Sequence, residues 1–386
     1  MFDAVPHTGV PSEQPASGHT APLSVHVVRD QYMLADLGPQ WEELVWRSAE
    51  ASAFSTPAAV LTWYRHVEQR SGVHAVTVWC ADELVGLAPF SVIRLGPFDL
   101  YSTAGAGFGY FGEPLLGENP EPVARAIAEH VSELVSKGTA AVYLRRLPEA
   151  SALQDTLSRR GDITCLPMGA AEVNCVVRFD QMPDPEQYFA RVARKHAVPR
   201  RFRRLAERFE HVEYLVDDHE LDLALDTMRD MLRRRFNTDL RIFSTASNRA
   251  LTRDLVHALS AAGHARVSCL IADGQRVTVT IDLNVGTKVF SYAVAYEPDL
   301  AEYSLGHLEL YKSLRNAHST GVNEVDLGSA DFAYKRRWAT TESHYRTVAI
   351  TAPGLKGRVA NNLRRATTKL HRADVLGHHK GGLHVL

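Results

Sequence analysis

One pattern of apolar runs and turns occurs twice along this chain. Each copy begins with two β-rich runs joined by a turn that contains an aspartate, at residues 74–93 and again at 264–283. An amphipathic segment that ends at a glycine follows in each copy, and then a short apolar run, at 141–144 and at 324–327. Because glycine adopts left-handed backbone angles without a Cβ clash, it is a typical residue just past the end of a helix.

The repeat predicts two lobes of the same architecture. Asp82 and Asp273, in corresponding turns, are 191 positions apart, and Gly138 and Gly321 are 183 apart, so the copies stay nearly in register. A unit of hairpin, further strand, helix and strand indicates an α/β (α+β) fold with two tandem lobes, each a twisted mixed sheet flanked by helices. One large α+β domain, in which the similar segments are a coincidence, is the alternative.

The length of the chain agrees with more than one domain. At 386 residues it exceeds what one hydrophobic core usually serves. The beginning is rich in Pro, Gly, Ser, Thr and Ala and lacks the pattern of a signal peptide. We therefore expect a disordered N-terminal arm at 1–23, a first lobe at 24–168, a second lobe at 169–352 that carries the active site, and a basic, partly helical tail at 353–386.

The composition favours a reducing compartment. The four cysteines lie far apart and form no CxxC pair, so neither a disulfide framework nor a zinc site is expected. No stretch approaches the roughly 20 apolar residues that span a bilayer. We expect a cytoplasmic protein without an integral membrane segment, and the net charge of −2 gives no global reason to expect a nucleic acid or membrane partner.

Two late motifs resemble a known family. Residues 303–308 (Tyr-Ser-Leu-Gly-His-Leu) resemble an S-P-G-x-L segment, and residues 331–338 (Asp-Phe-Ala-Tyr-Lys-Arg-Arg-Trp) resemble a G-D-E-x-Y-K-x-R-W signature. Both belong to the CelD/BcsL-type branch of the GNAT acyltransferase superfamily, which is similar to the FemABX peptidyltransferases. Phe54–Pro57 with Trp63-Tyr64 resembles the opening motif of the family. Leu305 departs from the family's usual Pro, and Ser329-Ala330 departs from its usual Arg-Gly. The resemblance covers roughly Trp41 to Ile350 and implies tandem GNAT lobes.

The segment 303–308 is the candidate donor site. A loop that enters a helix presents unpaired backbone N–H groups and the positive end of the helix dipole, which suit a pyrophosphate such as that of coenzyme A. A plain N-cap at Ser304 is the alternative. We expect Tyr292 and Tyr296 to share one face of a strand at 289–296, where they line the acyl channel or pack the sheet. The candidate donor-binding residues are Tyr303, Ser304, Leu305, Gly306, His307 and Tyr292.

Lys335, with Tyr334 beside it, is the candidate for transition-state stabilisation. A lysine near the acyl carbonyl stabilises developing negative charge. The FemABX relatives have a similar aromatic-Lys pair in the corresponding loop, which implies the same role here. A solvated basic turn at 335–337 is the alternative.

Three aspartates are candidates for proton removal, and a water relay is the alternative to a dedicated base. Asp331 and Asp326 are assigned to the catalytic group. Asp282 is assigned to the substrate side together with Trp338, which alternatively is a core aromatic. Tyr110 and Phe111 lie in a segment, Gly107–Phe111, that resembles the substrate-side loop of the family.

Basic residues are concentrated in the segments 191–208, 229–235 and 356–372. Together they suggest an anionic partner, such as coenzyme A phosphates, a phosphorylated acceptor or tRNA, and solvated helix faces are the alternative. Pro199 predicts that the first basic segment consists of two short helices. The anion or tRNA candidates are Arg194, Lys195, Arg200, Arg201 and Arg204.

These features predict an acyltransferase. It would move an acetyl or longer acyl group from acyl-CoA to an amine or hydroxyl of a small-molecule or envelope-related acceptor, without a metal. A FemX-like transferase that takes its acyl group from aminoacyl-tRNA is the alternative. A non-catalytic GNAT-like binding module is the second alternative.

Overall fold

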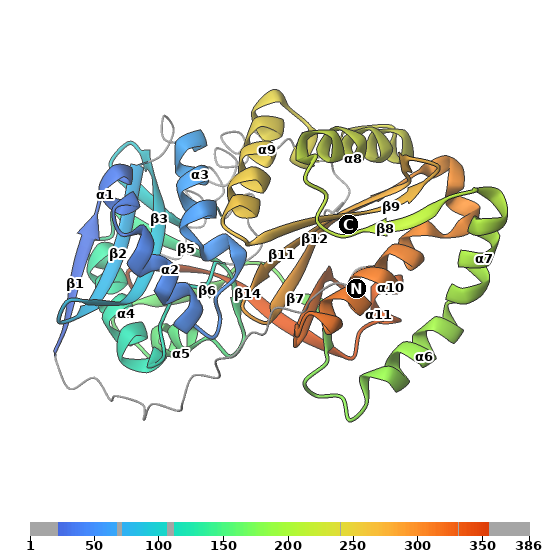
Figure 1. The fold of residues 1–386 in the computed structure, drawn as a ribbon. Coiled ribbons are helices and arrows are strands. Elements are labelled where there is room, and N and C mark those ends of the chain that lie inside the picture. The colour runs from blue at the N-terminus through green and yellow to red at the C-terminus, as the bar shows by residue number, and fades with distance from the viewer. Residues whose placement is uncertain (1–21, 68–71, 106–111, 240, 331, 355–386) are drawn as a thin grey trace.

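The computed structural model describes residues 22–67, 72–105, 112–239, 241–330 and 332–354. Over these ranges the chain forms one twisted mixed sheet flanked by helices (Figure 1). The described strands follow the order β1-β2-β3-β4-β5-β14-β7-β13-β12-β11-β9-β10, with β6 paired to β14 and β8 paired to β9. The predicted α/β class is therefore confirmed.

The repeat in the sequence is also a repeat in the fold. The first copy comprises β1 (Leu23–Val28), β2 (Gly72–Cys80), β3 (Glu83–Leu95), β4 (Phe98–Thr103), α4 (Pro120–Ser136) and β5 (Ala140–Pro148). The second comprises β9 (Ala265–Ala272), β10 (Gln275–Arg276), β11 (Thr278–Val285), β12 (Lys288–Tyr296), α10 (Leu305–Ser319) and β13 (Glu324–Ser329). In each copy the strand after the helix pairs in parallel with the strand before it, β5 with β4 and β13 with β12. The predicted unit of hairpin, strand, helix and strand is present twice.

Four further strands complete the sheet, and two of them, β14 and β7, connect the two copies. They are β6 (Thr164–Pro167), β7 (Glu172–Arg178), β8 (Val212–Leu215) and β14 (Thr341–Thr351). The beginning of β14 pairs with β7, next to β13, while its end lies between β5 and β6. The two lobes therefore share one continuous sheet, and β14, which follows the second copy in the chain, pairs with β5 of the first.

Helices cover both faces of the sheet (Figure 1). One face carries α1 (Gln31–Ala35), α2 (Gly38–Arg47), α3 (Pro57–Val67), α8 (Leu221–Phe236) and α9 (Ala246–Ala261), whose buried side chains form one core across both lobes. The other face carries α4 and α5 (Ala152–Ser158) in the first lobe, and α6 (Pro185–Lys195), α7 (Val198–Arg208) and α10 in the second. Short helical turns lie at η1 (Ala53–Ser55), η2 (Arg241–Phe243), η3 (Pro298–Tyr303) and α11 (Ala333–Arg336).

The sequence of α2 shows why such helices dock. Trp41, Leu44 and Val45 recur at helical spacing and are completely buried against the sheet. Full burial of one large apolar side chain contributes about 1.5–3 kcal/mol. This stripe therefore anchors α2 to the first lobe, as its periodicity predicts.

The first basic segment forms two helices, as predicted. The backbone of Ala197 is left-handed, with φ of 49°, and separates α6 from α7. Pro199 lies in the first turn of α7, where its missing N–H would have no helical partner.

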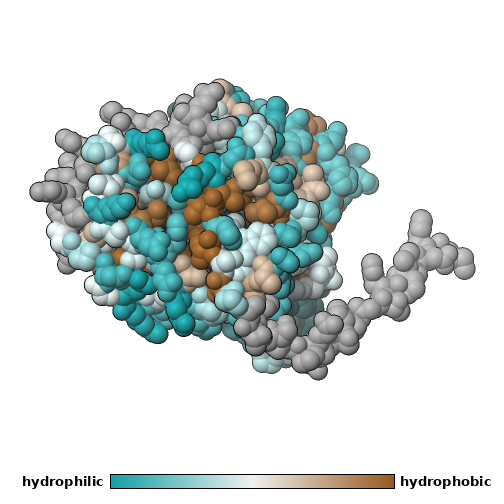
Figure 2. Space-filling model, turned by 90° about the vertical axis from the view of Figure 1, so that its left-hand side faces the viewer, coloured by the Kyte–Doolittle hydropathy of each residue, from teal (hydrophilic) through white to brown (hydrophobic). Residues whose placement is uncertain are grey.

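The side of the first lobe that faces away from the second lobe exposes apolar side chains. Figure 2 shows them gathered near the middle of this face, among hydrophilic side chains. The exposed large residues include Val25 of β1 and Tyr32 and Met33 of α1. Among the described residues, no helix combines the length and apolar character needed to cross a bilayer.

Candidate active site

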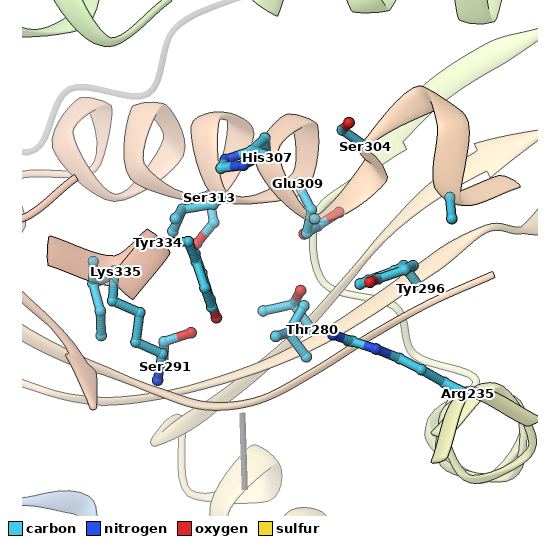
Figure 3. A pocket seen from close by; sticks show the side chains of 15 residues that line it. Arg235, Thr280, Ser291, Tyr296, Ser304, His307, Glu309, Ser313, Tyr334 and Lys335 are labelled. Carbon is cyan, nitrogen blue, oxygen red and sulfur yellow. The ribbon is translucent and has the colours of Figure 1, made fainter. Parts of the chain in front are cut away.

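A pocket of about 290 Å³ lies between α10 and the sheet of the second lobe (Figure 3). Its wall consists of β11, β12, β13, η3, the first part of α10, α11 and the last turn of α8. The lining residues are Arg235, Thr280, Ser291, Val294, Tyr296, Ala301, Ser304, Gly306, His307, Glu309, Leu310, Ser313, Leu327, Tyr334 and Lys335.

A bulge in β12 shapes this pocket. Ile281 of β11 is opposite Ala293, but the next residue, Asp282, is opposite Ser291. Tyr292 is therefore an extra residue in β12. Since side chains alternate between the two faces of a strand, an extra residue reverses the alternation beyond it.

The bulge corrects the prediction for Tyr292. Ser291 before the bulge and Val294 and Tyr296 after it all line the pocket. Tyr292 lies in the core on the opposite face, with its ring centroid 5.7 Å from that of Phe54. Tyr292 and Tyr296 thus do not share a face, and Tyr292 packs the sheet and contributes no side chain to the pocket.

The beginning of α10 opens into the pocket. Ser304 has a left-handed backbone, with φ of 55°, and its side chain makes no capping hydrogen bond, so it is not the plain N-cap considered above. Gly306 lies beneath the Tyr296 ring, and a Cβ at this position would be 3.5 Å from that ring. Tyr303 and Leu305 are buried in the core beneath α10, and their side chains are not part of the pocket wall.

Lys335 is buried, whereas its neighbours are not. Its exposed fraction is 4%, while Arg336 and Arg337 are exposed, which excludes the solvated basic turn. Its Nζ lies over the Phe332 ring, 5.2 Å from the centroid, and approaches Gly328 so closely that a Cβ there would be 3.2 Å away. Figure 3 shows the side chain extending along the pocket toward β12.

Tyr334 points its hydroxyl into the same pocket. Figure 3 shows the phenol directed from α11 toward the sheet, near Thr280. Burial raises the pKa of Tyr334 to about 12, so the phenol keeps its proton at neutral pH. The pocket therefore combines a buried ammonium, a protonated phenol and the beginning of a helix.

A family model described as an acetyltransferase (GNAT) domain matches residues 193–336. Residues 193–336 of the second lobe form a GNAT domain. The match includes every residue that lines the pocket. No curated protein sequence matches the chain.

Solved structures share this fold over most of the chain. FemX is 11% identical, with a TM-score of 0.61 over 81% of this chain and 95% of the other. The C-terminal domain of a putative lysylphosphatidylglycerol synthetase from Agrobacterium fabrum is 14% identical, with a TM-score of 0.52 over 86% and 96%. L-PGS from Bacillus licheniformis is 10% identical, with a TM-score of 0.50 over 88% and 97%. These similarities cover both lobes, so the fold of the whole described chain, and not only that of the GNAT lobe, resembles the fold of FemX.

Asp326 of the GNAT lobe is enclosed by hydrogen-bond donors. Its carboxylate accepts from both the Asn174 amide, at 2.8 and 3.0 Å, and the Gly328 backbone N–H, at 2.6 Å. The Tyr345 hydroxyl is a further donor at 3.4 Å. Burial raises the pKa of Asp326, and the nearby charges of Arg146 and Lys335 act in the opposite direction. A carboxylate bonded in this way suits positioning of the Gly328 turn and Lys335 better than proton removal.

Arg146 of β5 connects the first lobe to this aspartate. Its guanidinium is buried, donates to the Asn174 side-chain oxygen at 2.9 Å and forms an ion pair with Glu172. It also lies over the Tyr345 ring, 5.2 Å from the centroid. Its backbone is left-handed, with φ of 54°, a strained conformation for a residue with a Cβ.

Trp338 supports His307 and does not line the pocket. Its indole is completely buried, and its Nε1–H donates to His307 Nδ1 at 3.1 Å. Because Nδ1 accepts this bond, the proton of the neutral His307 ring is on Nε2. Burial and the nearby His196 ring, stacked at 4.6 Å, lower the pKa of His307 to about 4. The assignment of Trp338 to the substrate side is therefore wrong, because its indole packs in the core and its N–H is bonded to His307.

Arginines surround the beginning of α10. Arg235 lies over the Tyr296 ring, 4.3 Å from the centroid, at the wall of the pocket. Arg204 pairs with Glu302 of η3 at 3.1 Å. Arg234 pairs with Glu297 at 2.5 Å. The negative charges of Glu297 and Glu302, near the N-terminus of α10, are therefore neutralised by arginines. The basic segments of α7 and α8 thus meet at one end of the GNAT pocket.

The other predicted anion contacts lie on α6 and α7. Arg194, Lys195 and Arg200 are exposed. Arg201 is partly buried, which lowers its pKa, and its charge acts on the nearby His307.

Two buried acids belong to the pocket region. Glu309 lines the pocket with an exposed fraction of 1% and was not predicted from the sequence. The available signal was its spacing, because Leu305, Glu309 and Ser313 are each four residues apart on one buried helix face. Asp282 lies behind the pocket wall, where its carboxylate accepts from the Ser313 hydroxyl at 2.8 Å.

Three predicted site residues, Asp331, Tyr110 and Phe111, lie outside the described residues. Within the described ranges, no group of three or more His, Cys, Asp or Glu side chains is arranged to hold a metal ion.

Proposed function

We propose that the protein is an acyltransferase that binds acyl-CoA in the pocket of its GNAT lobe. The acyl group is transferred to an amine or hydroxyl of a small-molecule or envelope-related acceptor. The observation that carries this proposal is that one pocket joins the start of α10 to the buried Lys335. A binding module without catalysis would not require a buried ammonium in its pocket.

Each part of the pocket has a role in this reaction. The N–H groups in the first turn of α10 and the Arg235 guanidinium suit the phosphates of the donor. Lys335 stabilises the negative charge that develops on the acyl oxygen when the acceptor attacks. As the C–S bond breaks, Tyr334, still protonated at neutral pH, donates its proton to the departing thiolate, and the proton that the acceptor loses returns to the phenolate through water.

A charged tRNA is the second candidate donor. The exposed Arg194, Lys195, Arg200 and Arg204 on α6 and α7 favour it, and so does the likeness of the fold to FemX. Phosphate contacts of this kind weaken steeply with salt.

Isothermal titration with acetyl-CoA tests the first proposal. We expect binding by the wild type and a loss of at least about tenfold in Gly306→Phe, because the phenyl ring meets Tyr296 and covers the N–H groups of α10. Gly161→Phe is the matched control, since a Cβ at that position has open space around it. A flat titration with acetyl-CoA, together with a salt-sensitive gel shift with charged tRNA, would replace acyl-CoA by tRNA as the donor.

A further inference from the structure

The wall of the GNAT pocket contains a carboxyl group without a basic partner. Glu309 is 1% exposed, and Figure 3 shows its side chain reaching from α10 toward the sheet. It accepts hydrogen bonds from the hydroxyls of Thr278 and, at 3.4 Å, of Ser268. Among the described residues, no lysine or arginine forms an ion pair with Glu309 or with Asp282 behind it. Buried carboxyl groups are rare in proteins unless they are paired.

A second observation points to a ligand at the same place. Thr280 lines the pocket beside Glu309 with an exposed fraction of 2%. Its hydroxyl lies close enough to the Glu309 carboxyl to lower the pKa of that group, but it has no hydrogen-bond partner of good geometry among the described residues. One oxygen of the Asp282 carboxyl also lacks a hydrogen-bond partner of good geometry among the described residues, although the nearby Ser291 hydroxyl lowers the pKa of this carboxyl. This part of the wall therefore offers several oxygen acceptors and two negative or potentially negative groups.

We propose that Glu309 is the recognition site for a primary amine carried by a substrate of this pocket. An ammonium has three N–H donors and no acceptor, which matches a carboxylate surrounded by hydroxyl oxygens. The amine is carried either by the acyl group of the donor or by the acceptor. The choice between these two sources rests on the function proposed above, whereas the amine site itself does not.

The charge state of Glu309 agrees with this role. Burial raises the pKa of Glu309 to about 7, and the charge of Asp282 acts in the same direction. The other charged or titratable groups facing the pocket region are Tyr214, Arg235, Arg266, Asp282, Tyr296, His307, Tyr334 and Lys335. An ammonium bound beside the carboxyl favours its ionised form, so binding near pH 6.5 releases protons and binding at pH 8 releases almost none.

Two donors of equal size test the proposal. The acyl chain of β-alanyl-CoA ends in an ammonium group, and that of butyryl-CoA ends in a methyl group. For the wild type, titration is expected to give at least about tenfold tighter binding of β-alanyl-CoA, the effect of one charge-assisted hydrogen bond. In Glu309→Gln the two affinities become equal, so the preference for the ammonium over the methyl group is lost. Glu129→Gln, on the exposed face of α4, is the matched control.

A second arm separates the two sources of the amine. If the acceptor carries it, the two donors bind alike, and n-butylamine binds to the acetyl-CoA complex with an affinity that Glu309→Gln removes. If coenzyme A esters do not bind at all, the acyl-CoA proposal has failed. The amine site is then tested with 3′-deoxyadenosine that carries a 3′-alanylamino or a 3′-butyrylamino group, which resembles the end of a charged tRNA.

A measurement on the wild-type protein tests the proposal even if the Glu309→Gln variant does not fold. Titration of the amine-bearing ligand in buffers of different ionisation enthalpy at pH 6.5 should show proton release that butyryl-CoA does not show. The proposal is overturned if no amine-bearing probe loses affinity in Glu309→Gln, or if amine binding releases no proton.

Discussion

Replacement of Lys335 by methionine is expected to lower the rate of acyl transfer by about 10²–10³-fold, the range found when one oxyanion donor is removed. The side chain keeps its length and loses its charge, and the site where charge develops is buried and excludes water, so no solvent donor replaces the ammonium. The affinity for acetyl-CoA should stay within about threefold, because Lys335 acts mainly in the transition state.

The rate is measured as free thiol released from acetyl-CoA in the presence of a panel of primary amines. Lys137→Met, at the exposed C-terminus of α4, is the control and should keep full activity. Thermal unfolding of both variants checks that the fold is intact. A folded Lys335→Met protein with wild-type turnover would remove Lys335 from the chemistry.

Replacement of Arg146 by methionine is expected to lower the free energy of unfolding by about 2–3 kcal/mol, because loss of the buried guanidinium leaves a buried hydrogen-bond partner unpaired. The guanidinium is the common partner of Glu172, Asn174 and the Tyr345 ring. Without it, the Asn174 oxygen stays buried without its donor. The left-handed backbone of Arg146 also loses the contacts that hold it.

Arg346→Met is the matched control for this stability measurement. Arg346 pairs with Glu149 at 3.0 Å, but its side chain is 48% exposed. Such surface pairs contribute about 0–1 kcal/mol. Denaturant unfolding compares the two variants, and equal losses for Arg146→Met and Arg346→Met would contradict a structural role for the Arg146 network at the lobe junction.

The repeated unit of the fold was predictable from local patterns. Alternating runs, an aspartate turn and a helix-ending glycine each specify a hairpin or a helix end through interactions within a few residues. The shared sheet was not predictable, because the place of β14 between β5 and β7 depends on pairing between strands that are distant in sequence.

The candidate site was predictable in part, and the failures have identifiable physical causes. Motif resemblance brings Ser304, Gly306, His307, Tyr334 and Lys335 to one pocket. Strict alternation fails for Tyr292, because one extra residue in β12 reverses the faces. Glu309 was overlooked because a single acid in an apolar helix stripe reveals its burial only when the facing strands are known.

The most direct test of the proposed donor site is a crystal structure of the protein with a non-hydrolysable acetyl-CoA analogue. We expect phosphate density at the N–H groups of Leu305 and Gly306, and the acyl oxygen within hydrogen-bond distance of Lys335 Nζ. Density for the analogue in the first lobe, or an acyl group turned to solvent away from Lys335, would contradict this site.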